Sequence, residues 1–151
     1  MRLRTPEALW ALSCRLHQNG WCRLARLIKA LNWMMHKCLL PCEAIVGRNL
    51  LLEHYALGVV IHPQTIIGDD CRIFHQVTLA AESPIGSEHR IRIGKGVLIG
   101  AHAVIVARKN ASLRIGDHSI IGAGSVVVGD IPENEVWAGN PARKIKDRTA
   151  S

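Results

Sequence analysis

The sequence has few aromatic residues and no long apolar run. One Phe, one Tyr and four Trp make up 4% of its 151 residues, so we find no aromatic platform for stacking bases and expect no nucleic-acid partner. No stretch approaches the roughly 18 to 20 apolar residues that span a bilayer. The uncharged apolar core of a signal peptide is also missing, because Arg15, Arg23, Arg26 and Lys29 interrupt the N-terminal region. We therefore expect neither a transmembrane helix nor a secretory leader.

The cysteines give no sign of a disulfide framework or a metal site. There are five, an odd number, and four of them fall in or just after a helical stretch, a pattern that favours a reducing cytoplasm. His36, Cys38 and Cys42 are spaced like zinc ligands, but no second Cys or His pair completes the set. We predict a cytoplasmic protein without a bound metal.

The composition changes near residue 44. Before this point there are one Ile, one Gly and no Val, whereas fifteen Ile, eleven Val and twelve Gly follow it. Such a shift indicates two architectures in one chain. We expect an N-terminal helical segment over 1–43, a β domain over 44–130, and a closing loop and tail over 131–151.

The helical segment reads as a hairpin of two helices. Thr5 is a predicted N-cap with Pro6 at the first helical position, and Asn19–Gly20 is a stop signal. A second helix is expected over residues 21–37. Its apolar residues recur at helical spacing and predict one buried stripe, formed by Leu24, Leu27, Ile28, Leu31 and Met35.

Most of the positive charge lies in this hairpin. The whole chain has 19 Lys and Arg against 12 Asp and Glu, a net charge of +7, which favours an anionic ligand or surface. Seven of the basic residues precede residue 44, where the acidic residues are Glu7 and Glu43. A basic amphipathic hairpin can lie on a membrane or bind a partner. We favour packing on its own domain, with peripheral membrane contact as the alternative.

A six-residue period begins at Val46 and predicts the fold of the β domain. Three such units make one triangular coil of short strands, with the leading aliphatic side chains stacked inside. The leading residues are Val46, Leu52, Ile61, Ile67, Ile73, Leu79, Ile93, Ile99, Ile105, Ile115, Ile121 and Val127. The period is interrupted by three extra residues before Ile61, eight before Ile93 and four before Ile115. Insertions on a rigid solenoid are common places for function.

This pattern resembles the left-handed parallel β-helix of the hexapeptide-repeat family over roughly two thirds of the chain. The resemblance implies a mostly β, left-handed fold behind the short helical hairpin. It also implies a homotrimer, because members of this family usually close the apolar edges of a short coil by trimerising. Whether two trimers pair into a hexamer is left open.

Two histidines occupy the same place in successive coils. His54 stands two residues after Leu52, and His75 stands two residues after Ile73. They are 21 residues apart, which equals one coil of 18 plus the three inserted residues. We therefore expect the two rings to stack at about the 4.8 Å spacing of neighbouring strands. Such a pair can hold a neutral imidazole able to accept a proton.

The same region resembles serine O-acetyltransferases and short polysaccharide acetyltransferases such as that of colanic acid. The shared segments are 52–60, 77–79, 97–101, 121–127 and 138–143. The resemblance implies transfer of acetyl from acetyl-CoA to a hydroxyl, with His54 as general base behind the acid Glu53. It implies oxyanion donors from a backbone N–H in the loop after Leu79 or from the rings of His75 or His89.

Four positions depart from the pattern of the serine enzymes. Leu39 stands where they carry an orienting Asp, so Glu53 or Glu43 would have to hold His54. Ala80 and Ala81 replace their Gly-Gly pair. His89 is one residue out of register with their second His.

The resemblance also implies a path for coenzyme A in the groove between neighbouring subunits. Small residues on this path are Ala81, Ala101 and Ala123. The closing segment would cover the coenzyme and pair with its phosphates, through Gly139, Ala142, Arg143, Lys144 and Lys146. The acceptor stays open between L-serine, in cysteine biosynthesis, and a hydroxyl of a sugar or polysaccharide. A non-catalytic β-helix scaffold is the alternative of another class.

Overall fold

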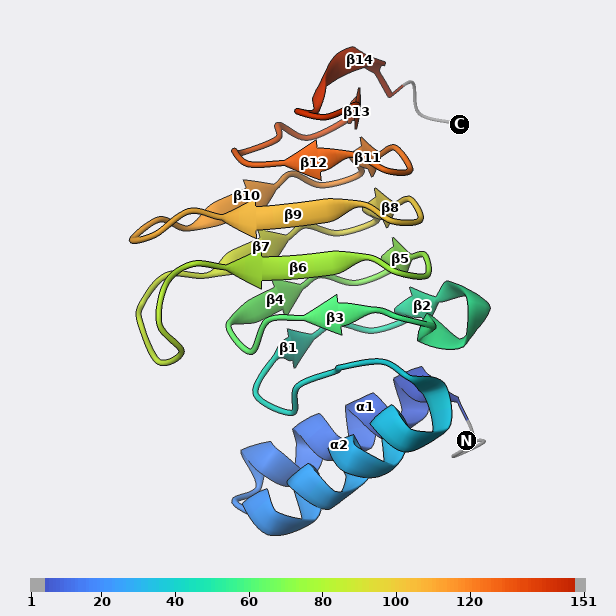
Figure 1. Cartoon of the computed structure of the whole chain (residues 1–151), viewed down its shortest axis with the longest axis vertical. Helices are drawn as coiled ribbons and strands as arrows, with labels where there is room; N and C mark the ends of the chain where they lie inside the picture. The colour runs from blue at the N-terminus through green and yellow to red at the C-terminus, as the bar shows by residue number, and fades with distance from the viewer. Residues whose placement is uncertain (1–4, 149–151) are drawn as a thin grey trace.

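The computed structural model describes residues 5–148 as a helical hairpin at one end of a parallel β-solenoid (Figure 1). The solenoid has about four turns, consistent with a left-handed β-helix. Its coils stack along the long axis of the molecule, and a β-hairpin closes the end opposite the helices.

The two helices begin and end near the residues that the sequence predicts. Helix α1 covers Pro6–Gln18, and its N-cap Thr5 accepts a hydrogen bond from the backbone N–H of Ala8 at 3.4 Å. Helix α2 covers Cys22–His36 and ends where Lys37 adopts the left-handed conformation.

Each coil contributes one short strand to each of three sheets. The first sheet contains β1 (Ile45–Val46), β4 (Thr65–Ile67), β7 (Ile91–Ile93) and β10 (Leu113–Ile115). The second contains β2 (Leu51–Leu52), β5 (Arg72–Ile73), β8 (Leu98–Ile99), β11 (Ile120–Ile121), β13 (Glu135–Ala138) and β14 (Arg143–Asp147). The third contains β3 (Val60–Ile61), β6 (Thr78–Ala81), β9 (Val104–Ala107) and β12 (Val126–Val127). All pairings are parallel except that of β13 with β14.

The repeat places its leading aliphatic residues in the core. In the second sheet Leu52, Ile73, Ile99 and Ile121 are directly paired along the stack and are buried. Equivalent ladders fill the other two sides of the coil, and Val46, at the open first coil, is only half-buried. Burial of these ladders supplies the main stabilising term, at about 25 cal/mol for each Å² of apolar surface removed from water.

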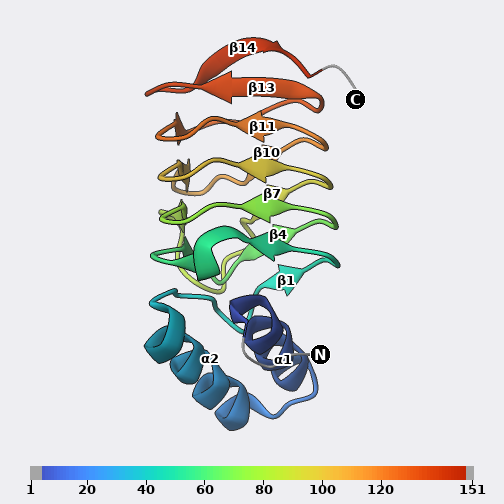
Figure 2. The same cartoon turned by 90° about the vertical axis from the view of Figure 1, so that its right-hand side faces the viewer.

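Helix α1 attaches the hairpin to the first coil. The buried Trp10 donates its indole N–H to the carbonyl of Pro41 at 2.8 Å, and Glu7 accepts the backbone N–H of Leu52 at 2.8 Å. Figure 2 shows α1 beneath β1, with α2 beside it.

The buried stripe predicted for the second helix is wrong. Helix α2 packs on α1 through Ala25 and Asn32, and Asn32 donates its side-chain amide to the carbonyl of Pro6 at 2.9 Å. Small and hydrogen-bonding residues thus make the close contact between the helices. The predicted stripe faces outward instead: Leu24, Leu27, Leu31 and Met35 are exposed, and Ile28 is half-buried.

The five cysteines are free thiols. Four of them are buried, and Cys22 is half-buried. Burial raises the pKa of Cys14 to about 12 and that of Cys38 to about 11. These two thiols are therefore protonated packing groups at neutral pH.

Candidate active site

The predicted histidine pair lies at the corner where the second and third sheets meet. The turns at this corner join β2 to β3, β5 to β6, β8 to β9 and β11 to β12. His54 belongs to the first of these turns and His75 to the second. Because the coils stack in register, the two side chains lie one above the other on the outside of the solenoid.

The three-residue insertion gives His54 its position. His54, Tyr55 and Ala56 follow one another with φ of 53°, 56° and 56°, all in the left-handed region. Three such non-glycine residues in succession are costly, and backbone strain of this kind clusters at functional sites. The buried Ala56 anchors the turn, while His54 and Tyr55 point to solvent.

The two imidazoles are in direct contact. Their ring centroids are 4.7 Å apart, which confirms the spacing predicted from the repeat, and Nδ1 of His54 lies 3.2 Å from Nδ1 of His75. A hydrogen bond between these atoms requires one protonated and one unprotonated Nδ1. The pair therefore cannot keep this bond when both rings are fully protonated.

A third histidine of the corner is missed by the sequence analysis. The ring of His102 lies 5.4 Å from that of His75 with an interplanar angle of 80°. His102 stands three residues after Ile99, whereas His75 stands two after Ile73, so comparison of equal places in the repeat passes over it. Its φ is 60°, in the left-handed region, and its side chain is exposed. A search that allowed one residue of slippage would have found it.

Glu53 does not contact His54. Its carboxylate accepts from the Nε of Arg72 at 3.1 Å and also from the Nη2 of the same guanidinium. The Cζ of Arg72 lies 5.9 Å from the centroid of the Phe74 ring. The ring centroids of Phe74 and His54 are 6.1 Å apart, and the two rings are nearly perpendicular. The expected contact between Glu53 and His54 is thus replaced by one with Arg72.

Glu43 does not take that place either. It lies close to Cys42 and Lys29, at the end of the hairpin. The polar side chain that meets the ring of His54 is His75, a residue that the sequence analysis proposes for a different role, as an oxyanion donor.

Small residues continue the column of His75 along the corner. Ala101 and Ala123 occupy the same place in the next two coils, and Gly124 donates its backbone N–H to the carbonyl of Ala101 at 2.8 Å. A Cβ on Gly100 would lie 2.6 Å from the backbone nitrogen of Ala123. Side chains are therefore short where a ligand could run along the coil from His75. Ala81 lies elsewhere, at the far end of β6, paired with Ala107.

The closing segment forms the β13–β14 hairpin at the end of the solenoid. Gly139 is in its turn with φ of 101°, and Ala142 is buried. Arg143 and Lys146 are exposed on β14. Lys144 pairs with Glu135 at 2.6 Å and with Asp147 at 2.7 Å. Hydrogen bonds to Asp147, which has the larger effect, and to Glu135 raise the pKa of Lys144. The ammonium group of Lys144 is thus already paired with two carboxylates.

His89 lies away from the pair. It belongs to the loop between β6 and β7, and its carbonyl accepts from the side chains of Gln64 and Arg90 at 2.9 and 3.0 Å. This loop projects from one edge of the third sheet, whereas the turn with His54 projects from the other (Figure 1).

Two features are missing from residues 5–148. These residues contain no group of three or more His, Cys, Asp or Glu placed to hold a metal ion. Within the same range no helix is both long and apolar enough to cross a membrane.

The fold and the repeat define a hexapeptide-repeat protein. A family model described as the hexapeptide repeat of succinyl-transferase matches residues 90–129. A serine acetyltransferase from Helicobacter pylori is 32% identical over 140 residues, which are 92% of this chain and 79% of the relative. A probable serine acetyltransferase from Oryza sativa is 44% identical over 100 residues, covering 66% of this chain and 31% of the relative. This chain belongs to the serine acetyltransferase family.

A solved structure shares both the coil and the helices. The crystal structure of serine acetyltransferase from Brucella abortus in complex with coenzyme A superposes with a TM-score of 0.85 at 28% identity. The match covers 100% of this chain and 59% of the Brucella chain. The chain thus spans a little over half of that enzyme and about a third of the plant relative.

Proposed function

We propose that this protein transfers an acetyl group from acetyl-CoA to a hydroxyl, with His54 as general base. The observation that carries the proposal is the contact between His54 and His75 at a corner lined by small residues. Membership of the serine acetyltransferase family and the coenzyme A complex of the Brucella relative support it.

The contact allows Nε2 of His54 to be the nitrogen that takes the proton. When Nδ1 of His54 donates to Nδ1 of His75, Nε2 of His54 is unprotonated and free to accept. The hydroxyl oxygen then attacks the thioester carbonyl as its proton passes to Nε2. Collapse of the tetrahedral intermediate breaks the C–S bond, and the coenzyme A thiolate leaves and regains a proton from His54. A thiol leaves readily because its pKa is only about 8.5.

His75 acts here as a positioning residue. A neutral His75 fixes the tautomer of His54 and accepts the hydrogen bond of the imidazolium as it forms. It thereby takes the role expected of a carboxylate, which neither Leu39 nor Glu53 fulfils. Oxyanion donors are a backbone N–H of the loop after Leu79 or the ring N–H of His75 or His89.

Coenzyme A would run from the histidines past Ala101 and Ala123 toward the closing hairpin, in a groove between neighbouring protomers of a homotrimer. Arg143 and Lys146 are the exposed cations there that could meet its phosphates. Lys144 is a weaker candidate because two carboxylates already hold it.

L-serine is the acceptor that the family favours, and a sugar hydroxyl is the second candidate. The second is favoured by His75 and by the basic helical hairpin. Release of free coenzyme A, measured with a thiol reagent, first with serine and then with a panel of sugars, separates the two. If no acceptor leads to release of coenzyme A and the protein also fails to bind coenzyme A, the alternative of a non-catalytic β-helix scaffold is supported.

The variant His54→Ala tests the general base. We expect turnover to fall by about two to four orders of magnitude, with coenzyme binding retained. His118→Ala is the matched control, because His118 is an exposed histidine in the turn between β10 and β11, away from the corner. Equal loss of binding and turnover in His54→Ala would assign His54 a structural role and reject the proposal.

A further inference from the structure

One face of α2, running outward from its edge beside α1, is an apolar surface that the described residues leave uncovered. Its six main members are Trp21, Leu24, Leu27, Leu31, Met34 and Met35, which we call the α2 stripe. Leu27 and Met34 are 63% and 61% exposed. Leucines and methionines at helical spacing with this exposure are unusual on a protein surface and mark a contact with another body.

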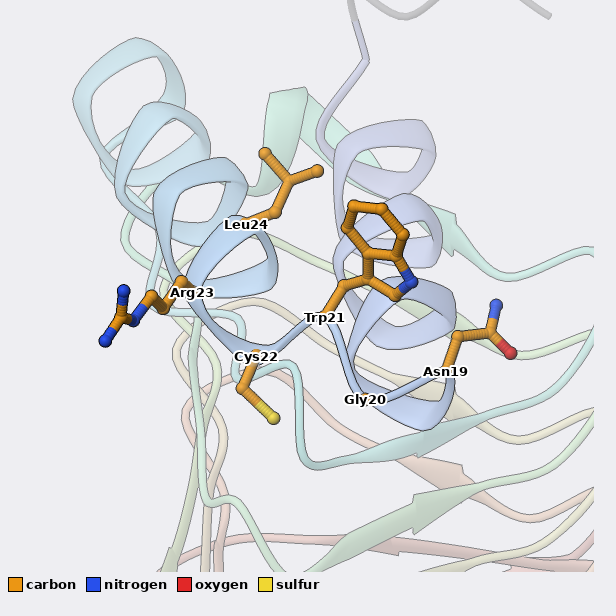
Figure 3. A pocket seen from close by; sticks show the side chains of 6 residues that line it. All are labelled: Asn19, Gly20, Trp21, Cys22, Arg23 and Leu24. Carbon is orange, nitrogen blue, oxygen red and sulfur yellow. The ribbon is translucent and has the colours of Figure 1, made fainter.

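Cations border the α2 stripe and carboxylates are missing from it. Arg23, Arg26 and Lys37 are exposed, and Lys29 is half-buried. No Asp or Glu occurs between Glu7 and Glu43, so both helices of the hairpin are free of acidic side chains after the first turn. In the close view of the turn before α2, Arg23 projects away from α1, whereas Trp21 and Leu24 lie toward the space between the helices (Figure 3).

This charge decides between two occupants. A second copy seated on the α2 stripe would bring two basic, acid-free helices together, and their charges would repel. An anionic lipid surface complements the same helix, since it takes up the apolar stripe at the acyl boundary and attracts the arginines at the headgroups. Trp21, exposed at the start of the stripe, is of the type enriched at that boundary.

We propose that the α2 stripe docks this protein on an anionic phospholipid surface, with α2 lying in the plane of the interface. The 15 residues of α2 are too few to span a bilayer, so the contact is peripheral. The hairpin is at the end of the solenoid opposite β13–β14, so docking leaves most of the coil in solution (Figure 1).

Co-sedimentation of the full chain with vesicles tests the docking. We expect binding to vesicles of phosphatidylcholine mixed with phosphatidylglycerol, weak binding to pure phosphatidylcholine, and weakening by salt. The double variant Leu27→Glu with Met34→Glu should lower the partition coefficient by about tenfold or more. Arg23→Gln with Arg26→Gln should lower binding to the anionic vesicles while leaving the weak binding to phosphatidylcholine unchanged.

The control carries the same charge change elsewhere. Ile85 and Ile145 are 71% and 61% exposed and lie outside the hairpin, so Ile85→Glu with Ile145→Glu should bind anionic vesicles like the wild type. The proposal is overturned if the wild type does not bind anionic vesicles. It is also overturned if Ile85→Glu with Ile145→Glu loses as much vesicle binding as Leu27→Glu with Met34→Glu. A change in oligomeric mass by light scattering for Leu27→Glu with Met34→Glu also overturns it, because the stripe would then be a protein contact. The readout is lipid binding alone, so its failure is distinct from failure of acetyl transfer.

Discussion

His62 differs from the histidines of the corner because its ring accepts a hydrogen bond from a backbone N–H. Its Nδ1 accepts the backbone N–H of Gln64 at 3.2 Å, which requires that nitrogen to be unprotonated. Partial burial lowers the pKa of His62 below its ordinary value of 6.5. The folded state therefore binds a proton here less readily than the unfolded chain does.

A pH dependence of stability follows from this difference. As pH falls through about 6.5, the unfolded state takes up the proton first and the free energy of unfolding decreases, levelling off below the folded pKa. In His62→Asn the shorter side chain can still accept the N–H two residues on, as in an Asx-turn. We expect the wild type to lose more stability than this variant between pH 7 and about 5.5, by urea unfolding followed with tryptophan fluorescence. Parallel pH curves would contradict the assignment.

At the residue scale, sequence predicts contacts within the repeat better than contacts outside it. The stacking of His54 on His75 follows from arithmetic, because the backbone ladder forces equal places to lie together. The contact between Glu53 and Arg72 cannot be predicted in this way. The two residues are 19 positions apart, and the repeat gives no reason to prefer Arg72 over His54 as the partner of Glu53. The contact of His102 with His75 is not predicted, because His102 stands one residue later in its repeat unit than His75, at a position with left-handed backbone.

At the element scale, the close stacking of the coils depends on glycine at the corners. A Cβ on Gly68 would lie 2.8 Å from the carbonyl carbon and oxygen of Gly94 in the next coil. Both obstacles are backbone atoms, so the strand has to shift. By contrast, a Cβ on Gly129 meets nothing within 4 Å.

The pair Gly68→Ala and Gly129→Ala tests this stacking. We expect Gly68→Ala to lower the free energy of unfolding by about 1 to 3 kcal/mol, the usual cost of overpacking. Gly129→Ala should stay within about 0.5 kcal/mol of the wild type. Thermal melts followed by circular dichroism give both values. Equal melting temperatures would mean that the coils can separate locally at little cost.

The elements themselves were predictable, but not every surface by which they pack. Periodicity identified both helices and most of the strands, because it reflects which side chains share a face. It could not say what an apolar face lies against. In α2 the contact with α1 uses Ala25 and Asn32, since small side chains allow close approach, and the larger apolar residues were left outside.

At the scale of the whole molecule, the outer surfaces of the sheets differ. The first sheet has two arginines in its outward column, which is Ile45, Ile66, Arg92 and Arg114. The outward column of the third sheet is uncharged, with Val60, Thr78, Val104 and Val126. An apolar outer face on a parallel sheet favours contact with another protomer. The turn with His54 and the loop with His89 lie at opposite edges of this third sheet. Packing of three copies through it would bring these edges of neighbours together.

Hybrid oligomers test such a shared site. We expect His54→Ala and His89→Ala each to be inactive alone, and activity to return when the two are co-expressed. Random mixing leaves one intact site in each mixed trimer, so recovery should be on the order of a quarter of the wild-type rate. A light-scattering mass of three chains should accompany it. Two inactive variants that never complement would place the whole site within one protomer or deny His89 a part in it.

The stack of coils also works as a ruler. In the second sheet the order β5, β8, β11, β13 places three coil rises between the level of His75 and the closing hairpin, a distance of about 14 Å at the usual strand spacing. Because each coil meets only its neighbours, a whole coil could be added or removed between β8 and β11 without refolding either end. Each such change would alter the length of the ligand that can contact both Arg143 and the histidines. The number of repeats therefore sets the length of ligand that the protein can accept.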